Sequence, residues 1–216
     1  MAKKYELVLD DTISLWGWKL FRIRALMSFG SVEVGDLGGY IQKEENLSHD
    51  GDAWVSGNAW VSGNAWVSGN AKVSGDAWVS GNAKVYGNAE VSGDAWVSGN
   101  AWVSGNTKVY GDAKVSGDAE VYGNAKVSGN TWVSGNAKVS GDAEVSELGD
   151  IIVFKNHWSS GRHFTYTKSN KMWKVGCFYG TSDELVKKAY KDSEKSGRYY
   201  KAYVDFVESL EKLDNQ

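Results

Sequence analysis

A six-residue repeat occupies residues 51–146 and constrains the fold of this chain more than any other feature. It reads Gly-Asp/Asn-Ala-x-Val-Ser sixteen times without an insertion, with Tyr in place of Ser at Tyr86, Tyr110 and Tyr122. Val fills the fifth position in every copy, and Ala fills the third except at Thr107 and Thr131. The fourth position varies between Trp, Lys and Glu. So short and regular a period predicts a stack of near-identical units rather than one irregular core.

Each repeat has the local chemistry of a short strand followed by a turn. Side chains alternate along an extended Ala-x-Val-Ser segment, so Ala and Val face one side while the variable residue and Ser face the other. Gly followed by Asn or Asp supplies a turn. The chain contains no Pro, as expected of a ladder in which every backbone N–H is paired. The repeat therefore predicts stacked β-strands with a Val core.

The pattern closely resembles the hexapeptide-repeat left-handed β-helix family. In that family three hexads make one triangular coil, and an inward aliphatic residue follows a small residue two positions earlier. Val55 with Ala53 and Val61 with Ala59 match this rule. The resemblance implies a mainly β fold, a single-stranded left-handed triangular β-helix of about five coils over residues 51–146.

With three hexads per coil, residues 18 apart share a face, and the variable position sorts into three columns. One column is aromatic with a single cation: Trp60, Trp78, Trp96, Lys114 and Trp132. A second is mixed in charge: Trp54, Lys72, Glu90, Lys108, Lys126 and Glu144. The third is Trp66, Lys84, Trp102, Glu120 and Lys138, flanked by Tyr86 and Tyr122. We expect the second column to form a solvated face.

The aromatic column is the main candidate for a binding face, and Trp66, Tyr86, Trp102 and Tyr122 form a second aromatic face. Neighbouring indoles could simply stiffen the sheet, but an exposed apolar strip rich in Trp is typical of contact surfaces. Self-association as a dimer or trimer is the first expectation, and a foreign protein or small molecule is the second. Lys114 could make a cation–π contact with Trp96 or Trp132. Trp54, Trp60 and Trp66 surround the first coil, where the N-terminal segment could cover them.

One corner of the predicted coil stacks several carboxylates. Asn58, Asp76, Asp94, Asp112 and Asn130 fall in one column, which places three Asp side chains in succession. A bound cation such as Ca²⁺ would relieve their repulsion, and solvation with screening by salt would do so as well. Solvation is the simpler interpretation.

Residues 1–50 are predicted to be a β cap at the first end of the solenoid. Residues 5–9 and 19–26 read as strands around a turn near Trp16, Gly17 and Trp18, and residues 34–41 lead toward the array. The segment Gly-Asp-Leu-Gly-Gly-Tyr-Ile at 35–41, followed by Glu-Asn-Leu-Ser at 45–48, resembles uncharacterised repeat proteins of bacterial, prophage and phage genomes. That resemblance implies no biochemical activity.

Residues 147–216 are predicted to be a small α+β module that caps, trimerises or docks. A strand at 151–154 precedes a hairpin of residues 163–167 and 172–175. Thr181 to Glu184 form a capping-box start for a helix through about Lys195, which Gly197 is expected to end. A second helix follows, with a face expected to be core: Tyr199, Tyr203, Phe206, Val207, Leu210 and Leu213. The stretch at 175–181 resembles the C-terminal module of the same phage-type proteins.

Composition and motifs exclude several function classes. A net charge of −3 and a pI near 5.7 give no basis for binding nucleic acid or an anionic membrane. One cysteine, Cys177, and the lack of an apolar leader favour the cytoplasm. Hexapeptide acyltransferases use a catalytic His beside a cleft, whereas the array contains no His, and His49, His157 and His163 lie outside it. Neither a cofactor nor a metal site is expected.

Three functions remain open from the sequence. The first is a non-catalytic phage- or prophage-type scaffold that self-associates, or binds a partner, through its Trp column. The second is a phage-encoded protein that sequesters a small molecule or inhibits a host factor. The third, disfavoured, is a hexapeptide acyltransferase.

Overall fold

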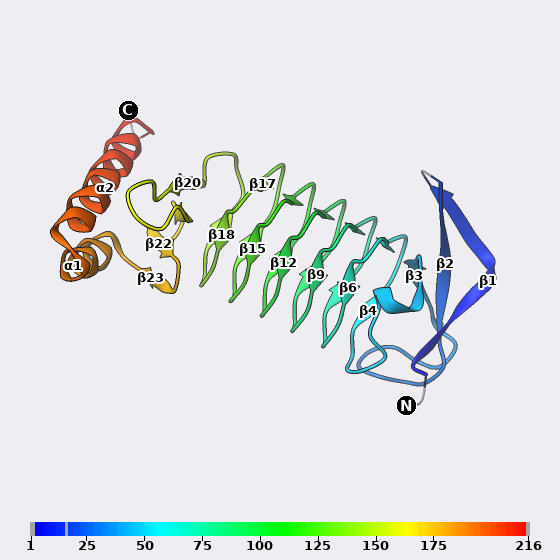
Figure 1. The fold of residues 1–216 in the computed structure, drawn as a ribbon. Coiled ribbons are helices and arrows are strands. Elements are labelled where there is room, and N and C mark those ends of the chain that lie inside the picture. Colours follow the sequence, from blue (N-terminus) through cyan, green and yellow to red (C-terminus); the bar gives the residue numbers. More distant parts are fainter. Residues whose placement is uncertain (1–2, 16, 215–216) are drawn as a thin grey trace. The chain divides into compact units, whose positions relative to one another are not determined.

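The computed structural model describes residues 3–15 and 17–214, and it is mainly β (Figure 1). The chain divides into two compact units, Met1–Asp150 and Ile151–Gln216. The first contains the N-terminal strands and the repeat array, and the second contains a small sheet with two helices. The predicted β-solenoid with a β cap and an α+β C-terminal part is confirmed.

Every hexad of the array forms one two-residue strand from its fourth and fifth positions. The strands are β4 (Trp54–Val55), β5 (Trp60–Val61), β6 (Trp66–Val67), β7 (Lys72–Val73), β8 (Trp78–Val79), β9 (Lys84–Val85), β10 (Glu90–Val91), β11 (Trp96–Val97), β12 (Trp102–Val103), β13 (Lys108–Val109), β14 (Lys114–Val115), β15 (Glu120–Val121), β16 (Lys126–Val127), β17 (Trp132–Val133), β18 (Lys138–Val139) and β19 (Glu144–Val145).

These strands stack into three parallel sheets, and each strand pairs with the strands 18 residues before and after it. The Trp78 N–H donates to the Ala95 carbonyl at 2.9 Å, and the Trp96 N–H donates to the Ala113 carbonyl at 2.9 Å. Backbone hydrogen bonds of this kind therefore join each turn of the solenoid to the next.

The interior of the solenoid is the column of Val and Ala side chains. Val55 through Val145 are at most 1% exposed in all sixteen copies, and the third-position residues are equally buried, including Thr107 and Thr131. Each buried Val contributes roughly 1.5–3 kcal/mol of hydrophobic free energy before conformational entropy is subtracted. The core therefore requires the same two small side chains in every repeat, which leaves the fourth position free to vary.

The turn glycines are required by geometry. Gly99 has φ +68°, in the left-handed region that glycine adopts without strain. A Cβ built on Gly99 would also lie 2.8 Å from the backbone nitrogen of Gly117 in the next turn. A side chain at this corner is excluded by both backbone conformation and space.

The N-terminal segment extends the solenoid beyond the repeats. Strands β1 (Tyr5–Leu15) and β2 (Trp18–Ala25) are antiparallel, and β3 (Leu37–Ile41) pairs with β2 on one side and, in parallel, with β5 on the other. The 3-10 turn η1 (Glu44–Asn46) follows, and Leu47 makes a parallel bridge to Val67. Residues 37–50 thus add two sides of a turn ahead of the first hexad, and the solenoid has about six turns. Trp16, in the predicted connecting turn, lies outside the described residues.

Two buried side chains satisfy the carbonyl groups at this end. The Lys4 Nζ donates to the Gly51 and Ala53 carbonyls at 3.1 and 2.8 Å. The Tyr5 hydroxyl oxygen lies 2.8 Å from both the Glu44 and the Leu47 carbonyl oxygens, and its single hydrogen is donated to one of them at a time. Burial lowers the pKa of Lys4 to about 8, against the opposing effect of nearby Asp52. The exposed edge of the first turn is therefore covered by donors instead of being left to pair with another chain.

The C-terminal unit packs two helices on an antiparallel sheet. Its strands are β20 (Ile151–Lys155), β21 (His163–Thr167), β22 (Met172–Val175) and β23 (Phe178–Gly180), in that order. Helix α1 (Ser182–Asp192) starts at Thr181 with the predicted capping box, and α2 (Glu194–Asp214) follows. The buried core is aromatic and aliphatic: Phe164, Tyr166, Trp173, Leu185, Ala189, Tyr200, Val204 and Val207.

Two predictions for these helices are wrong. The break between them falls at Ser193, whose backbone is extended, and not at Gly197, which lies inside α2. A Cβ on Gly197 would be 2.3 Å from the Tyr190 ring, so the glycine permits close contact between the helices. The buried face of α2 carries Tyr200, Val204 and Val207, whereas Phe206 and Leu213, predicted as core, are 50% and 63% exposed.

Among the described residues, no helix combines the length and the apolar character needed to cross a lipid bilayer.

Candidate functional site

The predicted aromatic column forms one continuous row on the sheet of β5, β8, β11, β14 and β17. Trp60 pairs in register with Trp78, Trp78 with Trp96, Trp96 with Lys114, and Lys114 with Trp132. We call these five residues the Trp ladder. Because the hexads repeat without insertion and three make a turn, the sequence spacing of 18 becomes a spacing of one strand, about 4.8 Å.

Within the ladder the side chains contact one another and remain partly accessible. The Trp78 and Trp96 rings stack with centroids 4.7 Å apart and an interplanar angle of 11°. Trp60 tilts against Trp78 at 6.0 Å. Trp96 is 36% exposed and Trp132 is 59% exposed. Stacking along the ladder thus stiffens the row and still leaves indole surface exposed. The column can therefore both stiffen the sheet and serve as a contact surface.

The Lys114 ammonium occupies the place of an indole in the row. It lies 5.1 Å from the centroid of the Trp132 ring and 5.9 Å from that of Trp96. The predicted cation–π contact is present on both sides. An ammonium group can therefore pack against these indoles without leaving the surface.

A row of carboxylates borders the Trp ladder. Asp76, Asp94 and Asp112 are exposed and each lies two residues before a member of the ladder. The Asn58 amide donates to Asp76 at 3.1 Å. Between residues 3 and 214, Trp16 aside, no three His, Cys, Asp or Glu side chains are grouped so that they could hold a metal ion. The carboxylates form a line and do not surround a point, which disfavours the Ca²⁺ interpretation of this corner.

The second aromatic face is broken by charges. Trp66 and Trp102 are 43% and 44% exposed, but Lys84 lies between them in the register and packs over the Trp102 ring at 5.1 Å. Tyr86 meets Trp102 edge-on at 6.5 Å. Further along, Lys138 and Glu120 form an ion pair at 2.7 Å beside half-buried Tyr122. This face offers separate indoles rather than a continuous row.

The charged column behaves as a solvated face over most of its length. Ion pairs join Lys108 to Glu90 at 3.3 Å and Lys126 to Glu144 at 2.7 Å. Its first residue is the exception, because Trp54 is only 7% exposed and packs edge-on against Phe29 at 5.4 Å. The N-terminal segment therefore covers one of the three indoles of the first hexads, whereas Trp60 is half-buried and Trp66 is exposed.

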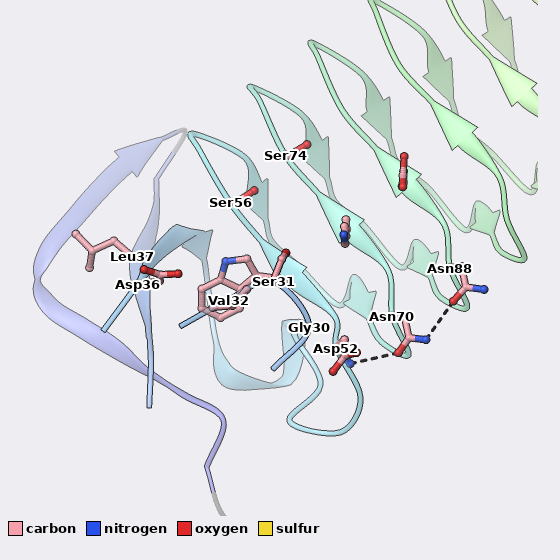
Figure 2. Close-up of a pocket in the computed structure, with 13 residues that line it drawn as sticks. Gly30, Ser31, Val32, Asp36, Leu37, Asp52, Ser56, Asn70, Ser74 and Asn88 are labelled. Atoms are coloured by element: carbon pink, nitrogen blue, oxygen red, sulfur yellow. Dashed lines mark hydrogen bonds between the residues drawn. The ribbon is translucent and has the colours of Figure 1, made fainter. Parts of the chain in front are cut away.

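This covering segment creates a cleft that the sequence did not predict. The cleft holds about 790 Å³ between residues 30–37 and the first turns of the charged face. Figure 2 shows Asp36 and Leu37 on the N-terminal side, and Asp52, Asn70 and Asn88 along one corner, joined by hydrogen bonds of 3.3 and 3.1 Å. Ser56 and Ser74 lie on the other edge of the cleft. Trp54, Lys72 and Glu90 also line the cleft. The only hint of this cleft in the sequence was the expectation that the N-terminal segment could cover Trp54.

The three histidines and the cysteine lie outside the hexads. The His49 Nδ1 accepts the Lys4 backbone N–H at 3.2 Å, and its ring stacks on Tyr5 at 4.3 Å. Burial lowers the pKa of His49, so its neutral form is favoured. His157 contacts Tyr199 edge-on, His163 begins β21, and Cys177 is exposed. None of them belongs to a metal-binding group among the described residues.

An apolar groove on the C-terminal unit was also missed. It holds about 390 Å³ and is lined by Phe154, His157, Tyr199, Ala202, Tyr203 and Phe206. Three of them, Tyr199, Tyr203 and Phe206, come from the face of the second helix that the sequence assigned to the core. Helical periodicity identified an apolar stripe correctly but not which part of it the sheet covers.

Comparison with known proteins identifies the repeat alone. Residues 53–69 and 83–99, both inside the array, match the YdcK beta-solenoid repeat family. No curated protein matches the chain.

Proposed function

We propose that this protein is a non-catalytic scaffold that self-associates through the Trp ladder. The proposal includes the finer features expected from the sequence: a left-handed, hexapeptide-type coil in a cytoplasmic protein of phage or prophage type. The observation that carries it is the stacked, partly exposed row of Trp78 and Trp96 with 59%-exposed Trp132 in register. A contiguous apolar row of this kind is rare on a monomeric surface.

The spacing of the ladder favours a second copy as the occupant. Its side chains repeat at the strand spacing of about 4.8 Å, and a second solenoid of the same sequence has the same period. Indoles are enriched among the residues that dominate binding energy. No other feature of the array offers a comparable contact surface, because the third face alternates charges with its indoles and the second is largely ion-paired.

The test is sedimentation of the full chain with Trp78→Ser and Trp96→Ser combined. We expect a smaller assembly than for the unaltered protein, since the core valines are untouched. The matched control combines Trp66→Ser and Trp102→Ser on the third face, and it should leave the assembly unchanged. An unchanged mass for the ladder variant would refute self-association through this face.

The cleft supports a second candidate, the sequestration of a small molecule. Its volume of about 790 Å³ lies within the usual range of ligand pockets, roughly 300–1,000 Å³. Mass spectrometry of the purified protein should then find a co-purifying compound. Ser56→Trp, which fills the cleft, should eliminate it, whereas Ser128→Trp on the same column outside the cleft should not. A compound retained by Ser56→Trp, or none in the unaltered protein, would contradict sequestration in the cleft.

A further inference from the structure

The two compact units carry opposite net charge. Met1–Asp150 has twelve Lys and Arg against nineteen Asp and Glu, a net of −7, and Ile151–Gln216 has twelve against eight, a net of +4. Together they give the −3 of the whole chain. A division of charge this large favours contact between the first unit of one molecule and the second unit of another.

On the negative unit, three carboxylates in consecutive turns border the Trp ladder. The other two corners of the solenoid are largely Asn ladders, in which each amide donates to the side chain one turn later, as Asn82 does to Asn100 at 2.9 Å and Asn88 to Asn106 at 2.9 Å. The corner beside the Trp ladder instead has Asp76, Asp94 and Asp112 in consecutive turns. Carboxylates cannot donate to one another, so this row has unused acceptor capacity facing solvent.

On the positive unit, helix α1 carries a matching row of cations. Lys187, Lys188 and Lys191 are exposed. Lys187 and Lys191 are four residues apart on one helical stripe, which places them about 6 Å apart along the axis. The ion pairs seen in the described part of this unit involve other residues: Lys168, Arg198 and Lys201. The three α1 ammonium groups are therefore available to an external acceptor.

From this complementarity we infer that the lysine row of α1 in one molecule docks on the Trp ladder of a second molecule. The α1 ammonium groups contact Asp76, Asp94 and Asp112, and the Lys stems lie along the indoles. The Lys114 ammonium, held between Trp96 and Trp132, shows the contact that an incoming cation would make. The inference rests on the proposed self-association and specifies which surface of the second copy meets the ladder.

Such a contact joins two different surfaces, so it differs in kind from a symmetric ladder-to-ladder pair. Each molecule retains one free surface after the first contact, and the assembly closes into a ring or grows as a chain. Because the attraction is between exposed charges, it is weakened by salt, with a screening length of about 10 Å at 0.1 M. A symmetric indole contact would depend little on salt.

A charge-swap experiment tests the inference with the full chain. One variant carries Asp94→Lys and Asp112→Lys, and the other carries Lys187→Glu and Lys191→Glu. In the described residues other than Gly, positive φ occurs at Lys171 alone, so these Asp positions accept a Lys without backbone strain. We expect each variant alone to sediment as a smaller species, and an equimolar mixture to regain assembly, because each supplies the surface that the other has lost.

A second variant removes the same negative charges by a smaller chemical change, so that loss of assembly is not confused with misfolding. Asp94→Asn with Asp112→Asn introduces the residue that other corners already use, and it should weaken assembly at least several-fold at low salt. The control, Asp118→Asn with Asp142→Asn, removes the same charge from the other two corners and should leave assembly unchanged. If all charge variants and the mixture assemble like the unaltered protein while the Trp78 and Trp96 variant does not, the ladder pairs with another ladder and the docking of α1 is wrong. If the Trp variant also assembles normally, the proposed function itself fails.

Discussion

The array and the C-terminal unit bury their side chains by opposite means. In the array the same two small residues are buried in every hexad, and each has its counterparts in the turns above and below. In the C-terminal unit, rings of different sizes surround Trp173 and Phe164, with contacts such as Phe154 on Phe164 at 5.3 Å and Tyr166 on Trp173 at 4.9 Å. The array therefore accepts Trp, Lys or Glu at its fourth position without a change in its core, whereas each core position of the C-terminal unit has its own size and its own set of neighbours.

This difference predicts how far the effect of a core substitution on stability extends in each unit. In a solenoid each turn contacts only its neighbours, so stability is a sum of nearly equal local terms. In the C-terminal unit a single large ring touches many partners, so its loss affects the whole unit.

Val97→Asp should be the most damaging change. It places a carboxylate between Val79 and Val115 in a column that is 0% exposed, where an unpaired charge has no partner. We expect a loss of more than about 4–5 kcal/mol in the free energy of unfolding, measured by urea titration with circular dichroism. Trp96→Asp, one residue earlier on the surface, is the control and should cost far less. Equal losses for the two would contradict the inward orientation of Val97.

Trp173→Ala should unfold the C-terminal unit selectively. The ring is completely buried, and truncation of a buried Trp or Phe costs about 3–5 kcal/mol. Hydrogen exchange should show lost protection in residues 151–214 and retained protection in the array. Loss of protection in the array as well would show that the two units fold as one.

Gly197→Ala should destabilise through contact between helices. The added methyl meets the Tyr190 ring, and overpacking costs about 1–3 kcal/mol, partly offset by about 1 kcal/mol of better helix propensity. The thermal midpoint should fall modestly, whereas Ser196→Ala beside it should change it little. A higher midpoint for Gly197→Ala would show that the helices separate freely.

The smallest effect concerns Lys4. Its pKa is about 8 in the folded protein against 10.5 for an ordinary Lys, so the unfolded chain binds this proton more tightly between these values. The free energy of unfolding should therefore gain a contribution that increases as pH rises from about 8 toward 10. Burial also raises the pKa of Tyr5 above its usual 10, which opposes the gain at higher pH. Urea midpoints between pH 7.5 and 9.5 should rise less in Lys4→Met, and an identical slope would contradict the assignment.

The sequence predicted the array almost completely, because burial there follows from position in the repeat. The register of Trp60 through Trp132 needed only the spacing of 18, and the capping box at Thr181 needed only local chemistry. The first turn was missed because Gly39, Ile41 and Leu47 fill its core positions without the hexad pattern. The position of Gly197 was misjudged because helix propensity cannot show that the Tyr190 ring lies against it. The cleft depends on where residues 30–37 fold back, which no periodicity encodes.

The spacing of 18 residues also limits how the gene can change in length. Deleting or duplicating three hexads within the array would remove or add a whole turn, and every downstream side chain would stay on its face. Deleting a single hexad would shift each later residue by one face and divide the Trp ladder between two sides. Length variants that keep this surface should therefore differ by multiples of 54 nucleotides, which encode three hexads. A change of 18 nucleotides, one hexad, would keep the coil but would move every later side chain to another face.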